Sequence, residues 1–219
     1  MPTDSRMLDN FVRVGQEILS CDWAAHYGPD IARVAPSPPG VGYAQPGFIG
    51  RDYRGLVFIG QNPGVGANRA DVHRLWKQAF QKWHEQGTVA AYAEVFEFWR
   101  RDLHEWIVWT QWIKPVLDRL NLSEDHIGYL NLCKNATSAN TPPTGRMYRS
   151  DWEWTRRQLD FLRPRVVVAG GVAVFNQLST LSPAPPAKVL SQNRERSQNQ
   201  AERDRQADVL ASAIRKALQ

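Results

Sequence analysis

The sequence predicts a three-layer α/β/α protein with a central four-stranded parallel sheet. Two observations favour this fold class. Short apolar segments of strand composition alternate with longer segments in which apolar residues recur at helical spacing. The apolar segments are nearly continuous, which is typical of strands buried on both faces of a parallel sheet. Helices that connect such strands by right-handed crossovers then cover both faces of the sheet.

Four segments have the composition of buried strands. The first, residues 56–59, reads Leu-Val-Phe-Ile and has a glycine on each side. The others are residues 127–133, 164–171 and 188–190. Each is followed by a polar or glycine-containing segment. Because the carboxyl ends of parallel strands share one edge of the sheet, and ligands bind at that edge, we expect the four exits to form one neighbourhood.

Helical periodicity accounts for most of the remaining chain. We expect an amphipathic N-terminal helix at about 5–20, three helical stretches at about 71–121, a helix after residue 150, a short helix at 172–178 and a C-terminal helix. Residues 35–47 are rich in proline and glycine, which predicts a long loop, either functional or a plain surface connection. No repeat or domain boundary is evident. Residues 1–219 are therefore expected to form one domain with its core at about 50–219.

Composition restricts the classes of protein that the chain can belong to. The formal net charge of +5 is compatible with a polyanionic partner such as nucleic acid. Cys21 and Cys133 are the only cysteines, too few for a disulfide framework or a four-thiolate cluster, which favours a reducing cytoplasm. No apolar run long enough to span a membrane and no signal peptide are evident. The nine tryptophans favour core packing, although some could stack on bases.

The first predicted strand is followed by a tight polar turn made of Gly60, Gln61, Asn62, Pro63 and Gly64. Proline and glycine together redirect the chain here. The turn leaves polar side chains and backbone N–H groups at the carboxyl end of the strand. The alternative is an ordinary strand-to-helix turn in which the asparagine only caps the next helix, and this stretch alone does not distinguish the two.

Three segments together resemble the uracil-DNA glycosylase superfamily. Residues 60–64 resemble its first motif, in the Gly-x-Asn-Pro-Gly form of the mismatch-specific and single-strand-selective branches. Asn131-Leu132-Cys133 resembles the segment whose asparagine reads the base in the single-strand-selective branch. Residues 154–171 resemble a helix-then-strand segment of the Fe–S branches. The resemblance covers about residues 50–195 and rests on the order and spacing of the motifs.

The chain departs from the family pattern in two places. It lacks the four cysteines of the Fe–S branches, so we expect no cluster, and we expect no other cofactor or metal. Ser191-Gln-Asn-Arg194 stands where the last motif usually has His-Pro-Ser, and no histidine follows His126. The mismatch-specific branch uses asparagine in this motif, so catalysis is still expected. The motif does not identify which base is the substrate.

The resemblance implies a monofunctional DNA glycosylase that acts as a monomer on duplex or single-stranded DNA containing a damaged or modified base. Asn62 would position the attacking water, and Asn131 would read the base unless it only caps a strand end. The remaining implied residues fall into three groups: Gln61, Gln192 and Asn193 for catalysis; Gly60 and Gly64 for the base; and Lys134, Arg146, Arg194 and Arg196 for DNA.

Several alternatives stay open. The resemblance also implies an aromatic side chain that stacks on the base, and Tyr43, Phe48, Trp76 and Phe80 are the candidates. His73 could supply a further polar group to the site. The chain could also be a superfamily member that binds nucleic acid without hydrolysing it. A small-molecule, nucleotide-binding protein with a flavodoxin-like sheet is a third possibility, although neither a Walker motif nor Gly-x-Gly-x-x-Gly is present. A role in repair and a role in defence against modified foreign DNA are equally compatible with the sequence.

Overall fold

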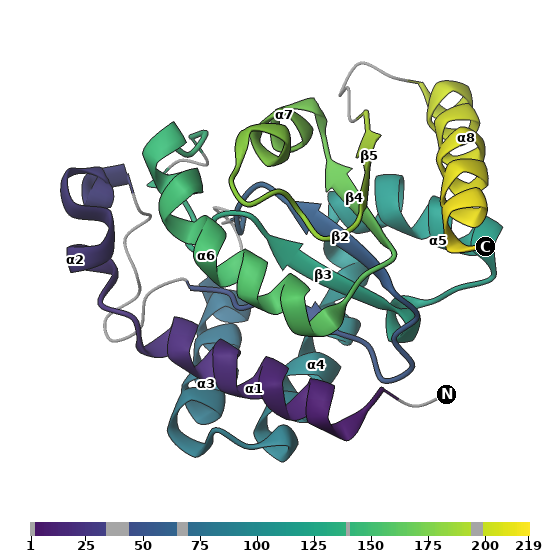
Figure 1. Cartoon of the computed structure of the whole chain (residues 1–219). Helices are drawn as coiled ribbons and strands as arrows, with labels where there is room; N and C mark the ends of the chain where they lie inside the picture. The colour runs from purple at the N-terminus through teal and green to yellow at the C-terminus, as the bar shows by residue number, and fades with distance from the viewer. Residues whose placement is uncertain (1–2, 34–43, 65–69, 139–140, 194–198) are drawn as a thin grey trace.

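A five-stranded sheet forms the centre of the protein, in the order β1-β3-β2-β4-β5 (Figure 1). A computed structural model describes residues 3–33, 44–64, 70–138, 141–193 and 199–219. The strands are β1 (Phe48–Ile49), β2 (Leu56–Gly60), β3 (Ile127–Asn131), β4 (Val166–Gly170) and β5 (Lys188–Gln192). Strands β2 to β5 are mutually parallel, and the predicted parallel sheet of an α/β protein is confirmed.

The prediction of four strands missed β1, which pairs antiparallel with β3 at the edge of the sheet. Strand β1 has two residues, so it shows no periodicity from which a strand could be recognised. It follows the Pro/Gly segment expected at 35–47, of which residues 35–43 lie outside the described part of the chain. The other four strands lie where the apolar segments predicted them.

The helices cover both faces of the sheet. Their bounds are α1 Ser5–Ser20, α2 Trp23–Tyr27, α3 Ala70–Gln86, α4 Val89–Asp102, α5 Lys114–Leu120, α6 Gly145–Leu162, α7 Val172–Thr180 and α8 Gln200–Leu218. Short 3-10 turns occupy Gly28–Arg33, Leu103–Glu105 and Glu124–His126, and a π-helical turn, η3 (Trp109–Ile113), leads into α5. In Figure 1, α6 and α7 lie in front of the sheet, with α1 packed against α6, while α5 lies beside α8.

Local sequence explains most of these boundaries. Helix α1 begins where Asp4 accepts hydrogen bonds from the backbone N–H groups of Arg6 and Met7, as an N-cap residue does. Strand β2 is fully buried from Leu56 to Ile59, as its apolar composition predicts, because it lies in the middle of the sheet. Helix α2 was not predicted, since five residues are too few to show a helical stripe.

The strand order places a crevice at a defined point of the sheet. The chain leaves β2 to form β3 on one side of it, and then crosses through α6 to form β4 on the other side. The chain then leaves β4 through α7 to form β5, away from β2, and two neighbouring strands whose connections run in opposite directions form a topological switch point, where ligands bind. The ends of β2 and β4 meet this condition. Among the described residues, no helix is long and apolar enough to cross a membrane.

Candidate functional site

The exits of β2 and β3 remain paired beyond the strands themselves. Gly60 of β2 is in register with Asn131 of β3. Past that pair, the backbone N–H of Leu132 donates to the carbonyl of Gly60 at 2.9 Å, and that of Cys133 donates to the carbonyl of Gln61 at 2.8 Å. The first predicted motif and the predicted base-reading asparagine therefore lie side by side, as the sequence predicts for strand exits at one edge.

Asn131 is the buried polar group at the centre of this neighbourhood. Its side chain is 2% exposed, and its Oδ1 has no hydrogen-bond partner among the described residues. A Cβ atom built on Gly60 would lie 2.6 Å from this Oδ1 and 2.8 Å from the hydroxyl of Tyr129. Glycine is therefore required here for close packing. An unsatisfied buried acceptor costs about 1–3 kcal/mol, so this oxygen is suited to a bound ligand that donates a hydrogen bond.

Gln61 and Asn62 are both half-buried and are held by their amide nitrogens. The Nε2 of Gln61 donates to the hydroxyl of Tyr148 on α6 at 2.5 Å. The Nδ2 of Asn62 donates to the Oγ1 of Thr137 at 3.1 Å and to the carbonyl of Pro63 at 3.2 Å. The Thr137 hydroxyl in turn donates to a backbone carbonyl at 2.5 Å. With the nitrogen of Asn62 bound to protein groups, its Oδ1 is the atom suited to accept a hydrogen bond from water.

Gly64 is not packed by the described residues, because a Cβ built on it meets none of their atoms within 4 Å. It lies at the end of the described part of this turn. On the opposite side of the switch point, Gly171 follows β4 with a φ of 110°, and a Cβ built on it meets no atom of the described residues within 4 Å. Neither glycine exit is therefore closely packed by the described residues.

The predicted last motif is displaced from the β2/β3 exits. Strand β4 lies between β5 and β2, so Gln192 is two strand spacings, about 10 Å, from the end of β2. Gln192 is 5% exposed, and its Nε2 donates to the carbonyl of Trp112 in η3 at 2.7 Å. Asn193 is half-buried, and both residues line a cavity of about 280 Å³ between β5, η3 and α8.

The predicted contact between Lys134 and a DNA phosphate is wrong. The side chain of Lys134 is fully buried, and its Nζ donates to the carbonyl of Asn131 at 2.7 Å and to the Oε1 of Gln158 at 2.8 Å. Arg146, by contrast, is exposed in the first turn of α6, and Arg149 is exposed one turn further on. Arg194 and Arg196 lie outside the described residues.

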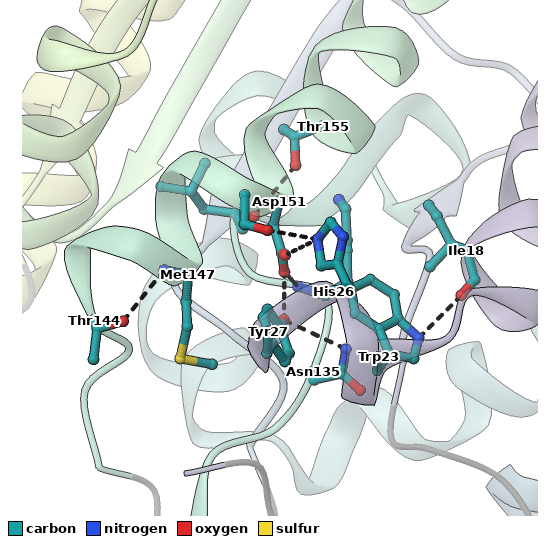
Figure 2. A network of polar contacts seen from close by, with 12 residues as sticks. Ile18, Trp23, His26, Tyr27, Asn135, Thr144, Met147, Asp151 and Thr155 are labelled. Carbon is teal, nitrogen blue, oxygen red and sulfur yellow. Dashed lines mark hydrogen bonds and ion pairs between the residues drawn. The ribbon is translucent and has the colours of Figure 1, made fainter. Parts of the chain in front are cut away.

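A buried carboxylate, which the sequence did not single out, holds the exit of β3 (Figure 2). Asp151 of α6 is fully buried and accepts hydrogen bonds from the Tyr27 hydroxyl and from the backbone N–H of Lys134, both at 2.6 Å. The Nε2 of His26 lies 3.2 Å from its other oxygen and 2.8 Å from the Ser150 hydroxyl. Burial and the adjacent carboxylate raise the pKa of Tyr27, which keeps the phenol protonated as a donor.

The aromatic candidates for base stacking are in the core. Phe48 stacks on Trp99 with a centroid distance of 4.4 Å, and Trp76 stacks on Phe80 at 5.4 Å. Phe48, Trp76 and Phe80 are each at most 5% exposed, so these three of the four candidates do not form a surface for stacking on a base. Tyr43 and the side chain of His73 lie outside the described part of the structure.

The fold and the polar cluster define a class of protein: an α/β protein with buried polar groups at the carboxyl ends of its parallel strands. Comparison with known families is more specific. The model of the uracil DNA glycosylase superfamily matches residues 46–213. The match covers more than half of the chain, so the chain belongs to this superfamily, which supports a glycosylase-type function on DNA. A search of curated proteins finds no match.

Proposed function

We propose that this chain is a monofunctional DNA glycosylase that removes a uracil-like, deaminated or otherwise modified base and leaves an abasic site. The observation that carries the proposal is the buried Oδ1 of Asn131, which packs over Gly60 and has no partner among the described residues. Gln61 and Asn62 follow Gly60 directly. The amide proposed to read the base, the amide proposed to hold water and a turn rich in N–H donors are therefore close together. No metal or cofactor takes part in this proposal.

The reaction requires stabilisation at both ends of the breaking bond. The bond from C1′ of the deoxyribose to the base nitrogen breaks, and its electron pair leaves with the base. A water oxygen bonds to C1′, and a proton from that water balances the charge of the departing base. The Oδ1 of Asn62 can orient the water, but an amide is a weaker proton acceptor than a carboxylate.

The departing base needs hydrogen bonds that recognise and stabilise it. The side-chain amide of Asn131 offers one donor group and one acceptor, which suits the edge of a base. Backbone N–H groups of Gln61, Asn62 and Gly64 can donate to a base carbonyl that gains negative charge. At the last motif we propose that Asn193 contributes rather than Gln192, because the amide nitrogen of Gln192 is already bonded to Trp112.

A base in a duplex must be flipped out before it can reach this site. Flipping requires cations that hold the phosphates on either side of the target nucleotide. Arg146 and Arg149 are exposed at the start of α6, whose next turns face the β3 exit. We propose these two residues as phosphate contacts on one side of the site, together with Arg194 and Arg196, which follow β5, on the other.

The decisive experiment is a single-turnover incubation of the protein with oligonucleotides that carry uracil, hypoxanthine, xanthine or modified cytosines, in single-stranded and duplex form. We expect alkali-labile breaks at one class of target base. A folded protein that produces no break with any of these substrates contradicts the proposal.

A second candidate is a superfamily member that binds nucleic acid without hydrolysis. The observation that favours it is the amide of Asn62, which stands where a carboxylate would be the stronger base. This candidate predicts DNA binding that weakens steeply with salt, and no abasic product. The same oligonucleotide panel, followed by binding titrations at two salt concentrations, separates the two candidates.

A further inference from the structure

A lysine lies buried directly behind the proposed base-reading residue. Lysine is almost never fully buried unless its ammonium is paired, yet Lys134 has no exposed surface. Its Nζ donates to the main-chain carbonyl of Asn131 at 2.7 Å and to the side-chain oxygen of Gln158 at 2.8 Å. The side chain thus folds back from the loop after β3 and binds the end of that same strand.

Helix α6 supports this contact from the other side. The hydroxyl of Thr155 donates to the same carbonyl of Asn131 at 3.2 Å. Gln158 keeps its orientation because its Nε2 donates to the carbonyl of Pro46 at 2.6 Å. The backbone of Asn131 is therefore held at its carbonyl by two donors, while its side chain projects over Gly60 with an unpartnered oxygen.

We propose that Lys134 is a positioning residue for the glycosylase reaction: its ammonium fixes the main chain of Asn131 and thereby the direction in which the Asn131 amide meets the base. The inference rests on the proposed role of Asn131. Lys134 itself touches neither base nor sugar, because it is enclosed by β3, α6 and the segment before β1.

The charge of Lys134 makes this contact sensitive to pH. Burial lowers the pKa of its ammonium to about 7, and the charged group that faces it acts in the opposite direction. The charged group is Asp151 of α6, which binds the backbone N–H of Lys134; burial raises the pKa of the neighbouring Cys133 thiol, so that thiol stays neutral at this pH. Hydrogen bonds from an ammonium are about twice as strong as those from a neutral amine. The hold on Asn131 therefore weakens as the pH rises through neutrality.

Two substitutions test the role from opposite directions. Lys134→Met has nearly the same volume and length but cannot donate or titrate. Gln158→Glu removes the hydrogen bond to the Pro46 carbonyl but places a carboxylate beside the ammonium, which should raise the pKa of Lys134. Lys114→Met is the matched control, since Lys114 is exposed on α5 and, among the described residues, pairs with Asp118 of its own helix.

The first readout is the side-chain amide resonance of Asn131 in ¹⁵N-labelled protein without DNA, followed from pH 5.5 to 9. We expect a shift with a midpoint near 7 in the unmodified protein and in Lys114→Met. The shift should be lost in Lys134→Met and displaced to higher pH in Gln158→Glu. An amide resonance with the same pH dependence in all four proteins overturns the inference, and Gln158→Glu decides the question if Lys134→Met does not fold.

The second readout is the pH dependence of the kinetics with the best base from the oligonucleotide panel. KM should rise above neutral pH in the unmodified protein and be flat in Lys134→Met, with kcat changed less than KM. If no base is excised by the unmodified protein, the proposed function fails, while the amide titration still decides whether Lys134 controls Asn131. A pH-independent KM in the unmodified protein contradicts the positioning role.

Discussion

At the scale of single residues, the proposed site depends on two amides whose nitrogen and oxygen atoms are used differently. Asn62 uses its nitrogen to bind Thr137 and Pro63, which leaves its oxygen for water. Asn131 has its oxygen buried without a partner among the described residues. A buried acceptor of this kind is a cost to folding that a bound base would offset.

Changing Asn62 tests the water-holding role. We expect Asn62→Ala to lower the single-turnover rate of base release by about 100-fold or more, and Asn62→Asp to raise it, because a carboxylate accepts a proton more strongly. Asn176→Ala, on the exposed face of α7, is the matched control. The role of Asn62 is wrong if Asn62→Ala is folded and as fast as the control.

Gly60 and Gly64 form a matched pair for testing the close packing. In Gly60→Ala the new methyl group would lie 2.6 Å from the Asn131 oxygen, whereas in Gly64→Ala it meets no atom of the described residues within 4 Å. We expect Gly60→Ala to lower the free energy of unfolding by about 1–3 kcal/mol and to raise KM, since Asn131 must move. Gly64→Ala should leave the free energy of unfolding unchanged. Urea denaturation of both variants measures the difference, and equal stabilities would contradict the geometry.

At the scale of secondary structure, α6 organises the site more than any strand does. Four of its side chains face the β2 and β3 exits: Tyr148, Asp151, Thr155 and Gln158. Their spacing of three or four residues places them on one stripe of the helix. They are polar, yet they are buried because each has a partner on another element. The stripe joins α2, the loop after β3 and the segment before β1 to a single helix.

The central member of the stripe should contribute most to stability. Asp151→Asn puts an NH₂ group among donors that need an acceptor, so we expect it to lower the free energy of unfolding by about 3–5 kcal/mol. Tyr27→Phe removes one donor and should cost about 1–3 kcal/mol. Asp160→Asn, at an exposed ion pair of the same helix, should cost less than about 1 kcal/mol. Thermal and urea unfolding of the three variants measures this order. An Asp151→Asn variant with an unchanged free energy of unfolding would contradict the role of Asp151 in the network.

At the scale of the whole molecule, the fold gathers the site from segments that are far apart in the chain. The exit of β2, the loop after β3 and α6 converge on the switch point, and α2 closes the network from the N-terminal part (Figures 1 and 2). Bringing them together buries a cation, Lys134, close to a carboxylate. The stability of the protein is therefore coupled to pH through a group that is remote from the surface.

The free energy of unfolding should show this coupling. The pKa of Lys134 falls from 10.5 to about 7 on folding, so between these values the unfolded chain binds more protons than the folded chain. Stability from this group therefore rises with pH across that window. We expect the difference in unfolding free energy between the unmodified protein and Lys134→Met to change by about 2 kcal/mol in favour of the unmodified protein from pH 7 to pH 9. Urea denaturation at intervals of half a pH unit measures it, and a constant difference would contradict a lowered pKa.

Local sequence patterns predict the strands β2 to β5, their parallel arrangement and the proximity of the β2 and β3 exits. Apolar runs, turn residues and alternation are local properties, and parallel strands have their carboxyl ends at one edge. The directions of the side chains beyond the strands follow from long-range packing and are visible in the folded protein alone. Lys134 turns inward to Gln158, Gln192 turns to Trp112, and Phe48, Trp76 and Phe80 pack in the core. These directions depend on partners 24 and 80 residues away for Lys134 and Gln192, and a strand exit carries no local signal of such partners.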